Sequence, residues 1–389
     1  MRTVLTAKRL WNGTSLLDDP VILIEHGRLA SIETRVASEL PIAGGDLVFN
    51  FPHATLSPAF FDVHIHGAAG HDVMEATPEA LTTIGRFLAA HGTGHYLATT
   101  VTAPLDATLR SLSALARLIA HPPNGDQTVT WPIGIHLEGP FLSHAKRGVH
   151  PPELLLAPDI AVFDRMYEAA EGTIRLMTLA PELLGAVEFA AHATGRGVRV
   201  SVGHSNATAA ETRAVLAAGA VSATHTFNAM RPLDHREPGI LGVVLATDSL
   251  FAELICDGIH NTPEMVKIWW RCKGPERAIL ITDAMSAAGM PDGEYSLAGL
   301  KIHVANGKAS FGDVLAGSVL SLDKALSNFV AFTGASVEQG LRLLTANPAA
   351  MTGFGDRAGS LEPGAPANIV AVNSDGKLEA SFLNGRKAE

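Results

Sequence analysis

The stretch FFDVHIHG, residues 60–67, decides how the rest of the chain is interpreted. It is a short apolar run of the kind that forms a buried strand, yet it carries His64 and His66 and then stops at Gly67. Side chains two positions apart on a strand point to the same face of the sheet. The two imidazoles therefore lie side by side where the strand ends, which is poor packing unless something binds them.

Similar apolar runs recur along the middle of the chain, each followed by a segment rich in Ala, Leu and Glu with helical periodicity. There are eight such runs, at residues 61–66, 96–100, 133–138, 174–180, 198–204, 221–225, 251–257 and 278–283. Eight strand–helix units predict an α/β fold of the (β/α)8 TIM-barrel type. A doubly wound parallel sheet is the alternative.

Both ends of the chain have a different sequence pattern, which predicts short strands separated by turns. We predict that residues 1–53 and 355–389 form one small β-sandwich domain built from both termini, and that residues 54–354 form the barrel domain. After the eighth run, residues 284–318 include DGEYSLAGLKIHVANGKASF, which predicts an inserted β-hairpin over the barrel mouth.

The composition narrows the class of protein. The 29 Lys and Arg residues against 39 Asp and Glu residues give a net charge of −10, which argues against a nucleic-acid or anionic-membrane partner. The chain has two cysteines, Cys256 and Cys272, so a fold held together by a framework of disulfides is not expected. The N-terminal residues lack the apolar core of a signal peptide, so a cytoplasmic location is expected.

Polar side chains stand at the ends of five of the eight predicted strands. They are His64 and His66 on the first, Glu138 on the third, His204 on the fifth, His225 on the sixth and Asp283 on the eighth. In a barrel the carboxyl ends of the strands meet at one face, where active sites lie. A lone histidine at a strand end is usually a structural hydrogen-bonding group. Four histidines and two carboxylates at one mouth instead predict a divalent metal site.

The residues that carry this pattern resemble the metal-dependent amidohydrolase superfamily. Its marks are the HxH of strand one, single histidines on strands five and six, and the aspartate of strand eight. The motifs HLEGPFLSHAKRGVHPPE (136–153), VSVGHSNA (200–207), THTFNAMRPLDHREPG (224–239) and ITDAMSAAG (281–289) narrow the resemblance to the N-acetylglucosamine-6-phosphate deacetylases. It covers essentially the whole chain.

The resemblance implies a metal-dependent hydrolysis of the acetamide of N-acetyl-D-glucosamine 6-phosphate to glucosamine 6-phosphate and acetate, in amino-sugar catabolism and cell-wall sugar recycling. It places the family's metal ligands on Glu138, His204 and His225. The additional HxH resembles members that hold two metals, with Glu138 bridging, so one or two divalent ions are expected per subunit. Zinc is the first choice and iron or manganese the alternatives.

The resemblance also assigns the remaining roles. Asp283 is the catalytic base and then acid, and His260 stabilises the acetyl oxygen. Substrate contacts fall on Val149, His150, Asn228, Ala229, Arg236, His260 and Leu315. Without the resemblance, Arg236 reads as a surface arginine paired with Asp234 or Glu237. With it, Arg236 binds the 6-phosphate in the neighbouring subunit's site, which implies a homodimer.

Two other functions fit part of the pattern. A dihydroorotase-like enzyme or an N-acyl-amino-acid deacylase has the same kind of metal cluster but not the spacing from Asn228 to Arg236. A non-catalytic barrel that binds a metal or a sugar phosphate needs no Asp283.

Overall fold

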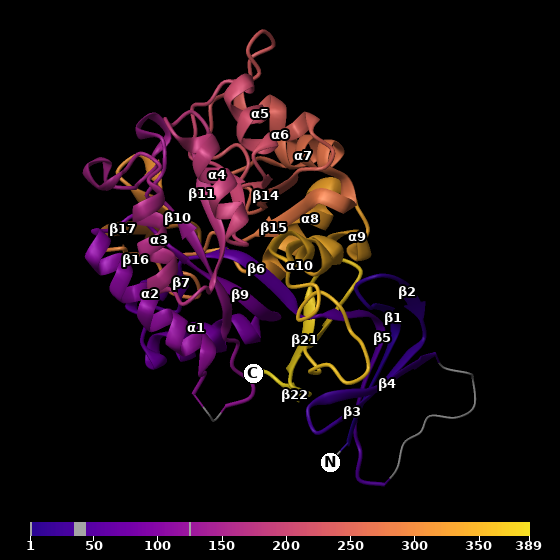
Figure 1. Cartoon of the computed structure of the whole chain (residues 1–389). Helices are drawn as coiled ribbons and strands as arrows, with labels where there is room; N and C mark the ends of the chain where they lie inside the picture. The colour runs from indigo at the N-terminus through magenta and orange to yellow at the C-terminus, as the bar shows by residue number, and fades with distance from the viewer. Residues whose placement is uncertain (1, 35–43, 124–125) are drawn as a thin grey trace.

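The computed structural model describes residues 2–34, 44–123 and 126–389, and its centre is a barrel of eight parallel strands (Figure 1). Neighbouring strands follow chain order, as the alternation of strands and helices predicts. The (β/α)8 barrel is thereby confirmed, and the doubly wound sheet is wrong. The strands are β6 (Phe60–Ile65), β9 (Thr93–Thr100), β10 (Pro132–Glu138), β11 (Ile174–Leu179), β12 (Arg199–Val202), β13 (Ala220–Ala223), β14 (Phe251–Ile255) and β15 (Ala278–Ile281).

A helix follows each barrel strand and packs its apolar face on the barrel. These helices are α1 (Pro78–Ala90), α2 (Leu105–Ala120), α3 (Ile160–Ala169), α4 (Ala186–Gly195), α5 (Ala209–Ala217), α6 (Gly239–Ala246), α7 (Pro263–Arg277) and α8 (Leu322–Thr333). In α1, Thr77 caps the N-terminus by accepting from the backbone N–H of Ala80, and the buried Leu81, Ile84 and Leu88 recur at helical spacing. Within the described residues, no helix is both long and apolar enough to span a membrane.

The barrel closes between β6 and β15 through a few specific bonds rather than a full ladder of paired residues. The backbone N–H of Asp283 donates to the carbonyl of His64 at 2.9 Å, and the N–H of His66 donates to the carbonyl of Ala284 at 2.8 Å. Below them, the Thr282 hydroxyl donates to the buried Asp62 carboxylate at 2.6 Å. The two strands that carry the HxH and Asp283 are thus fastened to each other at their carboxyl ends.

Strands from both ends of the chain come together in one unit beside the barrel, as the sequence predicts, and they form a single mixed sheet rather than the two sheets of a sandwich. One mixed sheet runs in the order β22-β21-β20-β5-β1-β3-β4, with β2 paired to β1, and it encloses a separate apolar core. Figure 1 shows the indigo and yellow ends of the chain side by side in it. The strands are β1 (Arg2–Trp11), β2 (Leu16–Asp18), β3 (Pro20–Glu25), β4 (Arg28–Thr34), β5 (Leu47–Pro58), β20 (Ile369–Val372), β21 (Leu378–Leu383) and β22 (Arg386–Lys387).

The limits of this unit differ slightly from the predicted ones. Strand β5 runs on to Pro58, past the expected boundary at residue 53, because its end pairs with β20 from Thr55 to Pro58. Of the predicted segment, residues 1 and 35–43 lie outside the described residues. Helices α9 (Val337–Leu344) and α10 (Ala346–Thr352) connect the barrel back to the sheet.

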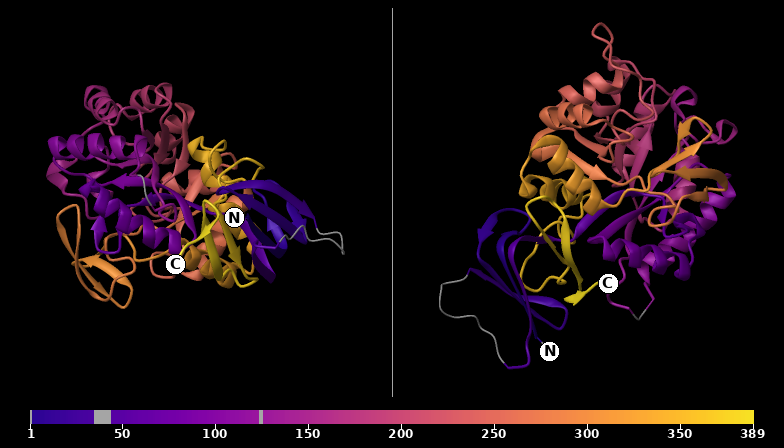
Figure 2. Two further views of the ribbon diagram at one scale, coloured as in Figure 1. Left: turned by 90° about the horizontal axis from the view of Figure 1, so that it is seen from below. Right: turned by 180° about the vertical axis from the view of Figure 1, so that it is seen from behind.

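The insertion after β15 is larger than the predicted hairpin. It is an antiparallel four-stranded sheet of β16 (Gly293–Leu297), β17 (Leu300–Ala305), β18 (Lys308–Phe311) and β19 (Val314–Leu315). Each of its three turns holds a glycine with positive φ, namely Gly299, Gly307 and Gly312. The sequence prediction of one hairpin accounts for only part of this series of turns. Figure 2 shows this orange segment and the terminal sheet on opposite sides of the barrel.

Candidate active site

The six polar residues predicted at strand ends lie together at the carboxyl end of the barrel. Three of them, His204, His225 and Asp283, stand two residues beyond the ends of β12, β13 and β15 and have φ angles of 46°, 29° and 51°. The left-handed region is costly for residues other than glycine and is concentrated at functional sites. The backbone here turns sharply so that each side chain points inward over the barrel.

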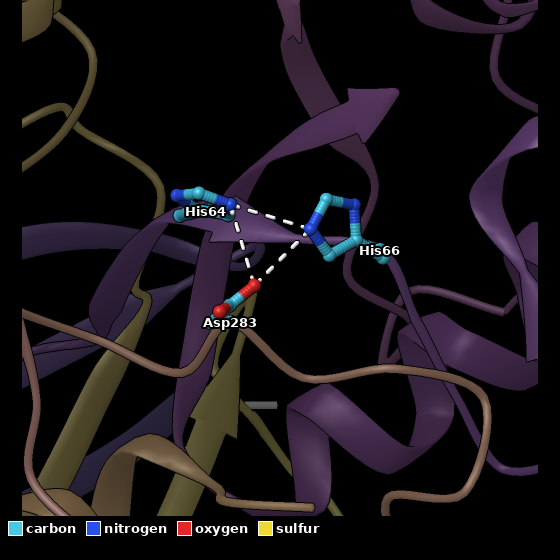
Figure 3. Close-up of side chains that lie close together, drawn as sticks. All are labelled: His64, His66 and Asp283. Atoms are coloured by element: carbon cyan, nitrogen blue, oxygen red, sulfur yellow. Dashed lines mark hydrogen bonds and ion pairs between the residues drawn. The ribbon is translucent and has the colours of Figure 1, made fainter. Parts of the chain in front are cut away.

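His64, His66 and Asp283 form one buried triad, and their polar atoms point toward one another (Figure 3). The Nε2 atoms of the two histidines are 3.3 Å apart. The Oδ1 atom of Asp283 lies 3.4 Å from Nε2 of His64 and 3.1 Å from Nε2 of His66. Two ring nitrogens and a carboxylate oxygen at these distances can share a single small cation.

Glu138, His204 and His225 form a second buried triad next to the first. The Oε1 atom of Glu138 lies 3.1 Å from Nε2 of His204 and 3.0 Å from Nε2 of His225. The same carboxylate reaches the first triad, because its Oε1 is 3.4 Å from Nε2 of His64 and its Oε2 is 3.2 Å from Nε2 of His66. Glu138 therefore lies between the two triads, in a position to bridge them.

The outer nitrogens of the imidazoles show that the two triads suit metal binding. Nδ1 of His66 lies 3.0 Å from the carbonyl oxygen of Thr99, and Nδ1 of His204 lies 2.9 Å from that of Lys146. A carbonyl oxygen only accepts, so Nδ1 must be the donor in each case, and the lone pair of Nε2 is free to bind a cation. The two buried triads are thus suited to two metal ions, and all the ligand types are ones that zinc, iron and manganese accept.

The charges in the site explain why a cation is favoured there. Burial works against charge on His66, but hydrogen bonds to Asp283 and Glu138 outweigh it and raise the pKa of His66 to about 9. Burial likewise opposes ionisation of Asp283, yet the nearby His64 and His66 bring the pKa of its carboxyl down to about 2. For His204 burial prevails and lowers the pKa to about 4, so this imidazole is neutral at neutral pH. The carboxylates of Glu138 and Asp283 are thus ionised, and without metal His66 carries the proton that balances them, so a bound cation would take the place of that proton on Nε2.

A cavity of about 440 Å³ opens above the two triads. All the predicted substrate contacts except Arg236 line it: Val149, His150, Asn228, Ala229, His260 and Leu315. His66, Glu138, His204, His225 and Asp283 form part of its wall, while His64 is completely buried behind them. The cavity therefore places a bound molecule directly against the carboxylates and imidazoles.

Two histidines at the rim are held in fixed orientations. Nδ1 of His260 lies 2.7 Å from the Asp257 carboxylate, which leaves its Nε2 free for the cavity. His150 lies with its Nδ1 2.9 Å from the hydroxyl of Thr102 and its Nε2 3.6 Å from Glu138. His150 therefore lies close to the Glu138 carboxylate as well as lining the cavity.

Arg236 does not line this cavity. It is exposed on the loop between β13 and α6, which projects at the top of Figure 1. Within the described residues, no ion pair joins its guanidinium to Asp234 or Glu237, although its backbone N–H donates to Asp234 at 2.9 Å. No contact in the described structure therefore supports the interpretation of Arg236 as a surface arginine paired with Asp234 or Glu237.

Several residues of the site are not predicted from the sequence. Lys146 and Arg147 line the cavity, and the insertion contributes Leu297 and Val314. Glu253 of β14 is fully buried and approaches His64 from behind. Glu253 stands in the middle of an apolar strand, and a charged residue in such a run is itself a signal that could have been used.

Comparison with known proteins agrees with this geometry. Residues 55–388 match the model of the amidohydrolase family. An N-acetylgalactosamine-6-phosphate deacetylase from Escherichia coli O157:H7 is 38% identical over 100% of both chains. An N-acetylglucosamine-6-phosphate deacetylase from Vibrio furnissii is 34% identical over 98% of this chain and 93% of its own.

Solved structures show the same relationship. One is a variant of the N-acetyl-D-glucosamine-6-phosphate deacetylase of Mycobacterium smegmatis in complex with N-acetyl-D-glucosamine 6-phosphate. It superposes with a TM-score of 0.91 at 35% identity, covering 100% of this chain and 99% of its own. The chain belongs to the amidohydrolase family and, by similarity over its full length, to the N-acetylhexosamine-6-phosphate deacetylases within it.

Proposed function

We propose that the protein hydrolyses the acetamide of N-acetyl-D-glucosamine 6-phosphate to glucosamine 6-phosphate and acetate. The observation that carries the proposal is the position of Glu138 between two buried triads at the wall of a single cavity, with Asp283 and His260 facing the same space. An amide is a poor electrophile and an amine a poor leaving group. A site for this reaction must therefore provide a nucleophile, polarise the carbonyl and protonate the nitrogen.

The residues of the chain divide these tasks. The two triads would hold divalent cations, which would supply Lewis acidity and lower the pKa of a water molecule in the cavity toward neutral. Asp283 is ionised and lies beside the cation ligands, so it accepts the proton of the attacking water and then delivers it to the departing nitrogen. His260, oriented by Asp257, donates to the acetyl oxygen as negative charge develops there.

N-acetyl-D-galactosamine 6-phosphate is the second candidate substrate. It differs only in the configuration at C4, and the relative from E. coli O157:H7 that is 38% identical bears the name of the deacetylase for that sugar. The other named relatives given above, which are 34–35% identical, are deacetylases for the glucosamine derivative. The acetamide and the 6-phosphate are common to both sugars, so the same catalytic residues serve either one.

Acetate release from the two sugar phosphates, measured side by side on zinc-loaded enzyme, tests the proposal. We expect the higher kcat/KM for N-acetyl-D-glucosamine 6-phosphate. A higher value for the galactosamine epimer would reassign the substrate within the same chemistry. Turnover of an N-acetyl amino acid but of neither sugar phosphate would overturn the proposal.

We further propose that the protein works as a homodimer in which Arg236 binds the 6-phosphate in the partner subunit's cavity. Arg236 is exposed on a projecting loop, and its guanidinium makes no ion pair with the described residues. Its planar guanidinium can bind two phosphate oxygens at once.

Arg236→Ala is expected to raise KM strongly for the phosphorylated sugar and to leave kcat/KM for the unphosphorylated N-acetyl sugar nearly unchanged. Loss of a charge-assisted hydrogen bond costs about 1.5–3 kcal/mol, which corresponds to roughly 10–150-fold in KM. His235→Ala, the exposed neighbour on the same loop, is the control. An equal effect of Arg236→Ala on both sugars would remove this residue from phosphate binding.

A further inference from the structure

Glu253 is a buried charged residue that none of the roles described so far uses. It lies in the middle of β14 with no exposed surface. Its Oε2 atom is 3.4 Å from Nδ1 of His64, and its Oε1 atom has no hydrogen-bond partner in the part of the chain that the structure describes. A buried carboxylate without a cation costs several kcal/mol, so such residues are retained for a reason.

The two nitrogens of His64 face different groups. Nε2 points to the metal-binding cluster, 3.3 Å from Nε2 of His66 and 3.4 Å from Asp283, whereas Nδ1 points away from the cluster to Glu253. His66 and His204 have neutral backbone carbonyls behind their Nδ1 atoms, and His225 has no Nδ1 partner among the described residues. His64 is therefore the one of the four imidazoles with a carboxylate behind it.

We propose that Glu253 is a positioning residue for the metal site: it holds the proton of His64 on Nδ1 and thereby strengthens cation binding by the triad of His64, His66 and Asp283. A carboxylate behind a ligating imidazole fixes its tautomer, orients the ring and makes the free nitrogen a better donor. The inference rests on the metal site of the proposed function but not on which sugar is the substrate.

A structural role for Glu253 can be compared with that of Asp62, the neighbouring buried acid. Asp62 accepts hydrogen bonds from the Thr282 hydroxyl at 2.6 Å and from the backbone N–H of His64 at 3.2 Å, so it holds β6 and β15 together. The side chain of Glu253 makes no such bond to backbone or hydroxyl groups in the described chain, and its one hydrogen-bond partner there is His64. Its carboxylate therefore acts on a ligand rather than on the frame of the barrel.

Zinc binding by Glu253→Gln, without any sugar present, tests the inference. The amide keeps the size of the side chain but removes its charge. Metal-free protein is titrated with zinc against a chromophoric chelator, and the zinc content is checked by elemental analysis. We expect wild type to bind two equivalents, and the variant to bind one of them about 10–100-fold more weakly with the other unchanged. Ser222→Ala, at a buried position on the adjacent strand β13, is the matched control and should bind as wild type does.

A second variant pair separates an effect through His64 from a general one. On a His64→Asn background, Glu253→Gln should weaken zinc binding no further, because the carboxylate then has no imidazole to act on. Wild-type binding of two equivalents by Glu253→Gln, equal weakening of both equivalents, or a wild-type protein that holds one zinc at saturation would each overturn the inference. Because the readout is zinc, failure of the proposed sugar-phosphate reaction leaves this result unaffected.

Discussion

Asp283→Asn lowers kcat for the acetylated sugar phosphate by about 10²–10⁴-fold, the range that a positioned acid–base group contributes. The asparagine has nearly the same shape but can neither accept the proton of the attacking water nor return it to the amine. Asp283 lies in the cavity wall with its Oδ1 atom 3.1 Å from Nε2 of His66, so its carboxylate is next to both the cation ligands and the substrate space. The measurement is acetate release at saturating substrate.

The zinc content of the same variant shows whether the loss is chemical. The triad of Glu138, His204 and His225 is untouched, so at least one equivalent of zinc should remain. Asp323→Asn is the control, because Asp323 also pairs with a histidine, His91 at 3.0 Å, and neither of these two residues lines the cavity. Near-wild-type kcat in Asp283→Asn would remove Asp283 from the role of acid and base.

Glu138→Gln is expected to have the largest effect of any single change on metal binding. The Glu138 carboxylate belongs to the second triad and lies 3.0–3.4 Å from the Nε2 atoms of all four histidines, so it also reaches the first triad. Loss of an outer partner of a metal ligand costs about 10–100-fold in affinity, and loss of a charged bridging ligand should cost more than that at both positions. Zinc content after dialysis and acetate release should therefore fall together.

The matched control for this change is Glu338→Gln. Glu338 is a carboxylate in an ion pair with Arg9 at 3.1 Å, outside the cavity. It should keep full zinc content and activity. A Glu138→Gln protein that retained two zinc equivalents would show that this residue does not bridge them.

The sequence predicts the site well where chemistry coincides with the end of a strand. His64 and His66 are recognisable because two imidazoles at the end of an apolar strand have no packing role. The other four residues are recognisable because each stands at the carboxyl end of a predicted strand; they are Glu138, His204, His225 and Asp283. In a parallel barrel the carboxyl ends of all the strands lie at the same face. The repeat alone therefore indicates that all six side chains meet.

Other parts depend on relationships that no local pattern contains. Glu253 lies in the middle of a strand, and its role depends on Nδ1 of His64 pointing toward it, which the sequence does not show. Lys146 supports His204 through its backbone carbonyl, to which the identity of the side chain is irrelevant. The insertion forms four strands because several glycine turns follow one another, and their pairing is set by the register of the whole sheet. Arg236 does not line the cavity of the described chain, so the phosphate-binding role proposed for it depends on a second copy of the chain.

Diffraction from crystals grown with zinc, recorded on both sides of the zinc absorption edge, tests the central claim most directly. Two anomalous peaks are expected, one on each side of the Glu138 carboxylate: the first within reach of His64, His66 and Asp283, and the second within reach of His204 and His225. Imidazoles turned away from one another, with no anomalous density between them, would contradict it.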